Sequence, residues 1–105
     1  MIDSNKITEI VNKIQSNFEL ESIILFGSYA NGTANKDSDL DLLIIKETDL
    51  PSHHRSFEIY KLLIGSMIPM DILVYTKKEF EEEKNQKFSF LYSALKNSKV
   101  LYERN

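Results

Sequence analysis

The chain of 105 residues contains no cysteine and no apolar run long enough to cross a membrane. Without cysteine, disulfide bonds and thiolate metal sites are excluded. A membrane-spanning helix needs roughly 20 apolar residues, and the N-terminal sequence MIDSNK lacks the basic and then apolar pattern of a signal peptide. We therefore expect a cytoplasmic protein.

Positive charge is also scarce. The chain has 13 lysines and arginines against 16 aspartates and glutamates, a formal net charge of -3, and no basic cluster. A protein that binds along a nucleic acid has to neutralise many phosphates, so this charge balance argues against a polynucleotide ligand. A single nucleotide accompanied by cations remains compatible with it.

Length and composition predict one globular domain that spans residues 1–105. Hydrophobic residues make up 42% of the chain and charged residues 28%, which is typical of a globular domain rather than a disordered one. No internal repeat or linker interrupts the sequence, and 105 residues leave little room for a second domain.

Apolar periodicity and turn residues predict alternating helices and strands. Isoleucine and valine recur at helical spacing over residues 4–17, with Asp3 or Ser4 available as the cap. Buried strands are expected at 22–26, 40–45 and 70–75. Further helices are expected from about 52 to 64, from 77 to a break near 85, and from 88 to 96. Residues 100–102 fit either a short strand or a frayed end.

This order predicts an α/β (α+β) fold, in which helices cover a small mixed sheet. The helix at 52–64 is expected to carry its apolar residues on one side, namely Phe57, Tyr60, Leu63 and Ile64. The segment Thr76 to Glu79 has the pattern of a capping box at the start of the next helix.

Three aspartates lie at the entrance of apolar strands. Asp39 and Asp41 are two residues apart, so their side chains should project from the same face with Cα atoms about 7 Å apart. Carboxylates at that spacing can bind one metal ion or a pair of ions of the kind that assists phosphoryl transfer. Asp71 stands at the start of strand 70–75, and it would join them if the two strands are neighbours.

Gly27 and Ser28 follow the first strand and suit an anion. If Ser28 begins a short helical turn, its free backbone amides would favour a phosphate, and Gly27 would allow that phosphate to approach the backbone. The Ser28 hydroxyl could donate to a phosphate oxygen.

Each feature has a structural alternative. A Gly-Ser pair after a strand can be only a turn, and Asp-Ser-Asp before a strand can be an Asx-type turn. Asp71 could be a strand-end residue held by a backbone amide. We interpret the adjacent His53 and His54 as solvated, because adjacent side chains on a helix diverge.

Together these residues resemble a known signature. The segments 27–30 (GSYA), 32–34 (GTA) and 38–42 (SDLDL) are similar to the pattern GSxARGxAxxxSDxDL of the minimal nucleotidyltransferase family, in the DNA polymerase β-like superfamily. The resemblance extends to Asp71 and to the closing residues 100–103, so it covers almost the whole chain.

The resemblance implies a polymerase β-like fold and transfer of a nucleoside monophosphate, usually AMP from ATP. It implies that Gly27 and Ser28 hold the triphosphate, and that Asp39 and Asp41 bind two Mg²⁺ ions. Asp71 would complete the second metal site and help to activate the acceptor hydroxyl. Many such short proteins are antitoxins that attach AMP to a tyrosine of an HEPN-domain ribonuclease toxin, so an HEPN partner is expected.

The signature departs from the family at one position, where Asn31 replaces the frequent arginine. Asparagine can donate hydrogen bonds but cannot neutralise phosphate charge, although Lys36 in the same loop could compensate. A second hypothesis is therefore a catalytically weak or inactive nucleotide-binding antitoxin that acts by direct binding. Transfer to a small molecule such as an aminoglycoside would need a second domain or a partner chain to complete the acceptor pocket.

Overall fold

The computed structural model describes all residues from 1 to 105 as five α-helices, one 3-10 helix and four strands. Along the chain these elements are α1 (Ser4–Asn17), β1 (Ser22–Phe26), α2 (Ser28–Asn31), β2 (Leu40–Ile45), η1 (Ser52–His54), α3 (Phe57–Leu62), β3 (Met70–Tyr75), α4 (Lys77–Glu83), α5 (Phe90–Leu95) and β4 (Lys99–Glu103). The three main strands have the predicted bounds.

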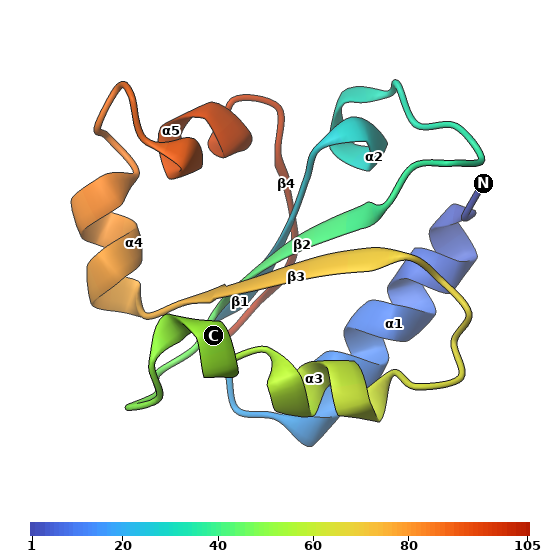
Figure 1. The fold of residues 1–105 in the computed structure, drawn as a ribbon, viewed down its shortest axis with the longest axis horizontal. Coiled ribbons are helices and arrows are strands. Elements are labelled where there is room, and N and C mark those ends of the chain that lie inside the picture. The colour runs from blue at the N-terminus through green and yellow to red at the C-terminus, as the bar shows by residue number, and fades with distance from the viewer.

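The four strands form one mixed sheet in the order β3-β2-β1-β4, as Figure 1 shows. β1 is antiparallel to both β2 and β4, whereas β2 and β3 are parallel. The short loop through α2 returns the chain beside β1, and the longer connection through α3 allows the parallel pair. The predicted mixed sheet is confirmed, and residues 99–103 are a strand at its edge.

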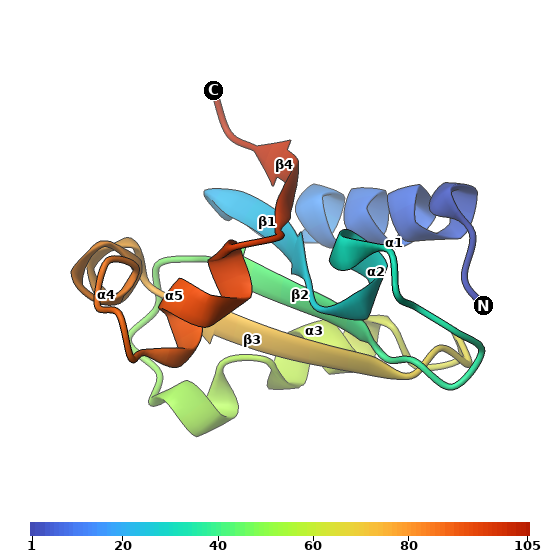
Figure 2. The same ribbon diagram turned by 90° about the horizontal axis from the view of Figure 1, so that it is seen from above.

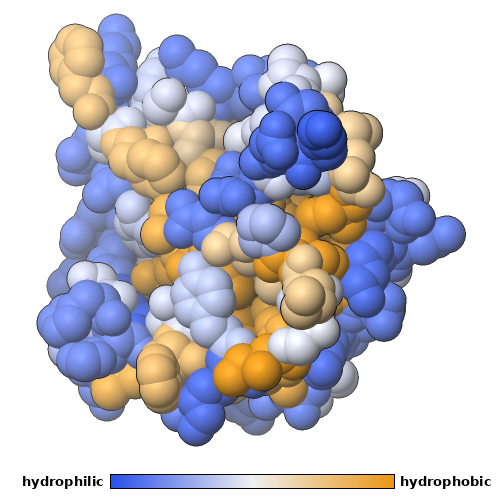
Figure 3. All heavy atoms as spheres, turned by 45° about the vertical axis from the view of Figure 1, so that its right-hand side comes forward, coloured by the Kyte–Doolittle hydropathy of each residue, from blue (hydrophilic) through white to orange (hydrophobic).

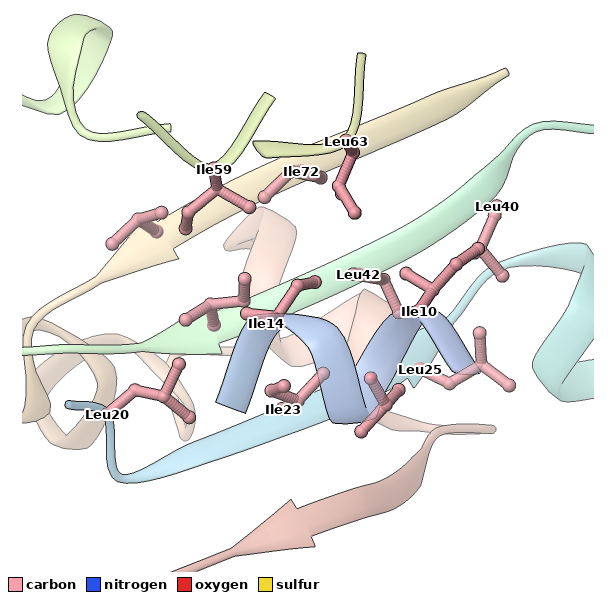
Figure 4. Close-up of a cluster of buried hydrophobic side chains, with 13 residues drawn as sticks. Ile10, Ile14, Leu20, Ile23, Leu25, Leu40, Leu42, Ile59, Leu63 and Ile72 are labelled. Carbon is pink, nitrogen blue, oxygen red and sulfur yellow. The ribbon is translucent and has the colours of Figure 1, made fainter. Parts of the chain in front are cut away.

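Helices cover both faces of this sheet (Figures 1 and 2). α1 and α3 pack on one face, where they contribute to a core cluster of 13 buried residues. Figure 4 shows Ile10 and Ile14 of α1 reaching toward β1 and β2, and Ile59 and Leu63 of α3 beside Ile72 of β3. The other face packs against α4 and α5 through a smaller cluster of five buried residues. Burial of both faces explains why β2 is apolar throughout after Asp41.

The helix α1 forms as its sequence pattern predicts. Ile10, Val11 and Ile14 are buried at helical spacing. The Asp3 side chain caps the helix by accepting a 2.9 Å hydrogen bond from the Lys6 amide. α1 is the longest helix with 14 residues, and no helix combines the length and apolar character needed to span a bilayer.

The prediction for residues 52–64 was wrong in length, and of the four residues predicted for its apolar face only Leu63 is buried. The segment is divided into η1 and a shorter α3, and the buried residues are Ile59 and Leu63. Phe57 and Ile64 are 62% and 79% exposed and Tyr60 is 38% exposed. Both stripes have helical spacing, so periodicity could not decide which one faces the sheet. α3 therefore presents an aromatic and apolar stripe to solvent.

The capping box predicted at the start of α4 is confirmed. The Thr76 hydroxyl accepts from the Glu79 amide, and the Glu79 carboxylate accepts from the Thr76 amide at 2.9 Å. Glu79 also accepts two hydrogen bonds from the guanidinium of Arg55, which fixes the segment before α3 against the start of α4. These hydrogen bonds, that from Arg55 first, lower the pKa of Glu79 from 4.5 to about 2.

We expect Glu79→Ala to destabilise the fold by about 1–2 kcal/mol, because the cap and the ion pair are both lost. Glu79→Gln should cost less, since its side-chain oxygen can still accept from Thr76. A lowered carboxyl pKa stabilises the fold above pH 4.5, and this contribution is lost as the pH falls toward about 2. Urea unfolding across that range should therefore show a steeper loss of stability for the wild type than for Glu79→Gln. Identical pH profiles would contradict this role of the ion pair.

Candidate functional site

The strand register brings two of the predicted site residues together. Asp41 pairs with Phe26 of β1 on one side and with Asp71 of β3 on the other. Side chains alternate along β2, and Leu43 and Ile45 belong to the cluster under α4 and α5. Asp41 therefore projects from that face, and Asp71 stands beside it at the same level. The condition that the second and third strands be neighbours is met.

Asp39 lies just before β2 and is exposed, whereas Asp41 is half-buried and Asp71 is exposed. Burial raises the pKa of the Asp41 carboxyl, and the negative charges of Asp71 and Asp39 raise it further. All three carboxylates are therefore close enough to interact electrostatically. The centre of this group is Asp41, the only one of the three that is removed from water.

No positive side chain neutralises these carboxylates. The five ion pairs of the structure involve none of the three aspartates. The side chains do not converge into a group of three that could hold a metal ion without rearrangement. Asp41 and Asp71 are thus adjacent oxygen donors with no cation supplied by the chain.

Gly27 is in direct contact with Asp41. Its backbone has φ 72° and ψ -155°, a conformation that is essentially restricted to glycine. A Cβ atom at this position would collide with Oδ2 of Asp41 and would lie 3.1 Å from Cγ. Gly27 and Asp41, which are separated by a loop in the sequence, are therefore in contact in the fold.

The short helix α2 begins at Ser28, so the condition set for an anion site at this position, a helical turn that starts at Ser28, is met. The amides of Ala30 and Asn31 donate to the Gly27 carbonyl, whereas the first amides of a helical turn have no partner within it. The Tyr29 hydroxyl accepts a 3.0 Å hydrogen bond from the Ile2 amide, which fixes α2 to the N-terminal residues. The backbone at Ser28 thus starts a turn directly beside the Asp41 carboxylate.

The loop between α2 and β2 is held by asparagine and serine rather than by aspartate. Asn35 Oδ1 accepts from the Asp37 amide at 2.8 Å, and Ser38 Oγ accepts from the Asn35 amide at 2.9 Å. An Asx-type turn is present, but its side chain is Asn35. The carboxylates of Asp37 and Asp39 are not needed for it, so the structural alternative does not explain Asp39.

The Asn31 side chain has a local structural role. Its Oδ1 accepts from both the amide and the hydroxyl of Thr33, which stabilises the turn after α2. Lys36 is exposed in the following turn and forms none of the five ion pairs. Neither residue brings a positive charge into contact with the aspartates.

A cavity of about 230 Å³ lies beside Gly27, and no pattern in the sequence predicts it. α5 forms its far wall, where the Phe90 ring packs edge-on against Phe26 at a centroid distance of 5.7 Å. Its lining residues are Phe26, Gly27, Asn31, Phe90, Ser93, Ala94 and Asn97. α5 is distant from Gly27 in the sequence, so only the tertiary fold brings these residues together.

His53 and His54 take no part in this group of aspartates. Both are exposed on η1, with ring centroids 4.1 Å apart. This agrees with their interpretation as solvated residues.

Comparison with known proteins agrees with this geometry. A family model described as a nucleotidyltransferase domain matches residues 7–102. A protein of Methanocaldococcus jannaschii named "Putative protein adenylyltransferase MJ0604" is 32% identical over 104 residues, which cover 97% of this chain and 100% of that protein.

Solved structures share the fold at lower identity. A crystal structure described as a putative nucleotidyltransferase from Sulfolobus solfataricus aligns with a TM-score of 0.67 and 22% identity, over 95% of this chain and 79% of that one. A toxin-antitoxin structure with AMP-PNP aligns with a TM-score of 0.62 and 23% identity, over 99% of this chain and 76% of that one. The family model covers nearly all of the chain, and the chain belongs to the nucleotidyltransferase domain family.

Proposed function

We propose that this nucleotidyltransferase transfers AMP from ATP to a hydroxyl group of a partner protein. The observation that carries the proposal is the position of Asp41, which pairs with Asp71 on one side and contacts Gly27 on the other. A phosphate at Gly27 and Ser28 would then lie next to carboxylates that can bind its counter-ions. The cavity beside Gly27 offers space for the nucleoside.

The aspartates suit Mg²⁺, which prefers oxygen ligands and is commonly held by carboxylates together with substrate phosphates. Asp39, Asp41 and Asp71 would hold two such ions. Their mutual repulsion, with no lysine or arginine paired to them, is the electrostatic condition that a divalent cation relieves. When bound, Mg²⁺ supplies positive charge that neutralises the triphosphate and stabilises the leaving group.

The residues of the chain would position and activate the acceptor. The acceptor oxygen forms a bond to the α-phosphorus of ATP as the bond from that phosphorus to the bridging oxygen of the β-phosphate breaks. Pyrophosphate leaves, and Asp71 accepts the hydroxyl proton. The backbone at Gly27 and Ser28 holds the phosphates and so fixes the direction of departure.

The proposed acceptor is a tyrosine of an HEPN ribonuclease toxin, and the chain would act as the antitoxin. The signature of the minimal nucleotidyltransferase family supports this assignment. The relative from Methanocaldococcus jannaschii is named as a protein adenylyltransferase, and a toxin-antitoxin complex with AMP-PNP shares the fold. Modification of the toxin would suppress its ribonuclease activity.

A second candidate function is neutralisation of the partner by binding alone. Asn31 favours it, because the amide oxygen is used within the loop and no arginine stands near the phosphates. In this case the chain would bind the nucleotide but would transfer AMP slowly or not at all.

Mass spectrometry of the intact partner separates the two functions. The purified chain is mixed with a candidate HEPN-domain partner, ATP and Mg²⁺, and we expect a mass gain of one or more AMP units on the partner. The same mixture with the chain carrying Asp39→Asn and Asp41→Asn should show none. Inhibition of the partner that persists with this variant, without any mass gain, would refute transfer and favour binding alone.

We expect Asn31→Arg to lower the KM for ATP by about fivefold, because a guanidinium near the phosphates adds about 1 kcal/mol of favourable interaction. Asn31→Met is the matched control, since it also removes the hydrogen bonds to Thr33 but adds no charge. Steady-state transfer at varied ATP checks both variants. An equal KM for the two variants would show that charge at this position does not limit nucleotide binding.

A further inference from the structure

A second, larger cavity of about 590 Å³ runs beside the outer edge of β3, and Asp71 belongs to its wall. We refer to this cavity as the β3 groove. Its other walls come from η1, the start of α3, and α4. Residues that line it include Ser52, Arg55, Ser56, Tyr60, Asp71 and Glu83.

The order of the strands places the β3 groove on the side from which an acceptor has to arrive. Gly27 ends β1, Asp41 lies on the central β2, and Asp71 lies on the edge strand β3. In phosphoryl transfer the attacking and leaving oxygens stand on opposite sides of the phosphorus. With the leaving pyrophosphate at Gly27 and Ser28, the nucleophile approaches from the side of Asp71. The β3 groove opens beyond Asp71 on that side.

The β3 groove is acidic. Asp71, Glu79 and Glu83 line it, and Arg55 is the only lysine or arginine that does so. Arg55 is committed to Glu79 through two hydrogen bonds, so the negative charges of Asp71 and Glu83 are not balanced by a cation. Burial and the Glu83 charge raise the pKa of the neighbouring Tyr75 hydroxyl, which agrees with a negative potential in the groove. A ligand with positive charge fits this wall.

The edge of β3 is partly closed by side chains. The Tyr60 hydroxyl accepts from the Ile72 amide at 2.7 Å, and Arg55 donates to the Val74 carbonyl at 3.4 Å. A bound polypeptide would therefore lie against these side chains rather than join the sheet as a fifth strand.

The surface beside the β3 groove suits a protein ligand. Phe57 and Tyr60 of α3 and Ile64, which follows the helix, form an exposed stripe, and Tyr60 belongs to both the stripe and the groove wall. Figure 3 shows that apolar side chains gather on this side of the molecule, among polar ones. Aromatic and apolar residues around a polar cleft are typical of protein interfaces. A small acceptor molecule would not need an apolar surface that extends beyond the cleft.

We propose that the β3 groove binds an extended segment of the acceptor protein, with the acceptor hydroxyl at Asp71 and a nearby lysine or arginine toward Glu83. This inference rests on the proposed transfer of AMP to a protein, and it adds the site and the charge of the segment that is modified.

Peptide binding tests the β3 groove without any transfer of AMP. The probe is a short fluorescent peptide with a central tyrosine between lysines. The control peptide has glutamates in place of the lysines. Fluorescence anisotropy should show binding of the lysine peptide only, and Glu83→Lys should weaken it by about fivefold. Glu82→Lys, on the same helix but outside the groove wall, should change it less than about twofold. Equal effects of the two variants, or equal binding of the two peptides, would overturn the inference.

Two further measurements keep the outcomes distinct. Glu83→Gln retains an acceptor for the 3.2 Å hydrogen bond from the Tyr75 hydroxyl, so it should weaken peptide binding while leaving the melting temperature unchanged. The lysine peptide is then incubated with the wild type or with Glu83→Lys in the presence of ATP and Mg²⁺, and its mass is measured by mass spectrometry. A peptide that binds at the groove but gains no AMP counts against the proposed transfer alone. A peptide that gains AMP equally with wild type and Glu83→Lys counts against the groove alone.

Discussion

Replacement of Asp41 by asparagine is expected to reduce AMP transfer by about a thousandfold and to make the metal-free protein more stable. The two effects have one cause. Burial and the charges of Asp71 and Asp39 raise the pKa of Asp41, so its ionised form is disfavoured in the folded chain. The same charge, placed beside the phosphates, is what the reaction needs. Activity and stability are therefore opposed at this residue.

The direction of the pH effect follows from the raised pKa. A carboxyl whose pKa is higher in the folded state than its ordinary value of 3.8 favours folding while it is protonated. The contribution of Asp41 to the stability of the metal-free wild type should therefore decline as the pH rises above 3.8, and Asp41→Asn should lack this dependence on pH. At neutral pH its melting temperature should be higher than that of the wild type.

Asp37→Asn is the matched control for this experiment. Asp37 is exposed in the loop that precedes β2, and only its backbone amide takes part in the turn there. We expect wild-type transfer and an unchanged melting temperature. If Asp41→Asn retained transfer at the level of Asp37→Asn, the assignment of Asp41 to the site would be wrong.

Gly27→Ala is expected to show the second large effect, a loss of about 1–3 kcal/mol of stability together with the loss of transfer. The backbone conformation disfavours any side chain, and the new methyl group would occupy the place of the Asp41 carboxylate. Urea unfolding measures the first loss and the transfer assay the second. Gly65→Ala also has a positive φ, of 94°, but nothing lies within 4 Å of its Cβ position. Gly65→Ala should therefore lose stability only because its backbone conformation disfavours a side chain, and it should retain AMP transfer.

A double-mutant cycle isolates the contact between Gly27 and Asp41. Asp41→Ala removes the atoms that the new methyl group would meet, so it should relieve part of the damage caused by Gly27→Ala. Strict additivity of the two stability changes would show that the carboxylate does not press against Gly27.

The sequence predicts the strands well, because each is a short and mainly apolar run: β1 and β2 are buried on both faces, and β3 buries Ile72 and Val74. The capping box at Thr76 and Glu79 was equally predictable, since both partners lie within one turn of α4. The adjacency of Asp41 and Asp71 was only conditional. It depends on the order of strands in the sheet, which a local pattern does not contain.

Other features depend on contacts between distant parts of the chain. The ion pair of Arg55 with Glu79 joins residues 24 positions apart, and the cavity beside Gly27 needs α5 as its wall. The exposed face of α3 was assigned wrongly because Phe57 and Tyr60 follow the same helical period as Ile59 and Leu63. Packing against the sheet decides which side of α3 is buried, and the periodicity of the sequence contains no information about that packing.

The central claim is that Gly27 and Ser28 form one Mg²⁺-dependent nucleotide site with the aspartates. Calorimetric titration with a non-hydrolysable ATP analogue, with and without Mg²⁺, tests it most directly. We predict that Mg²⁺ strengthens binding to the wild type by at least about tenfold, and that this dependence disappears when Asp39 and Asp41 are both replaced by asparagine. The same Mg²⁺ dependence in the double variant as in the wild type would contradict the claim.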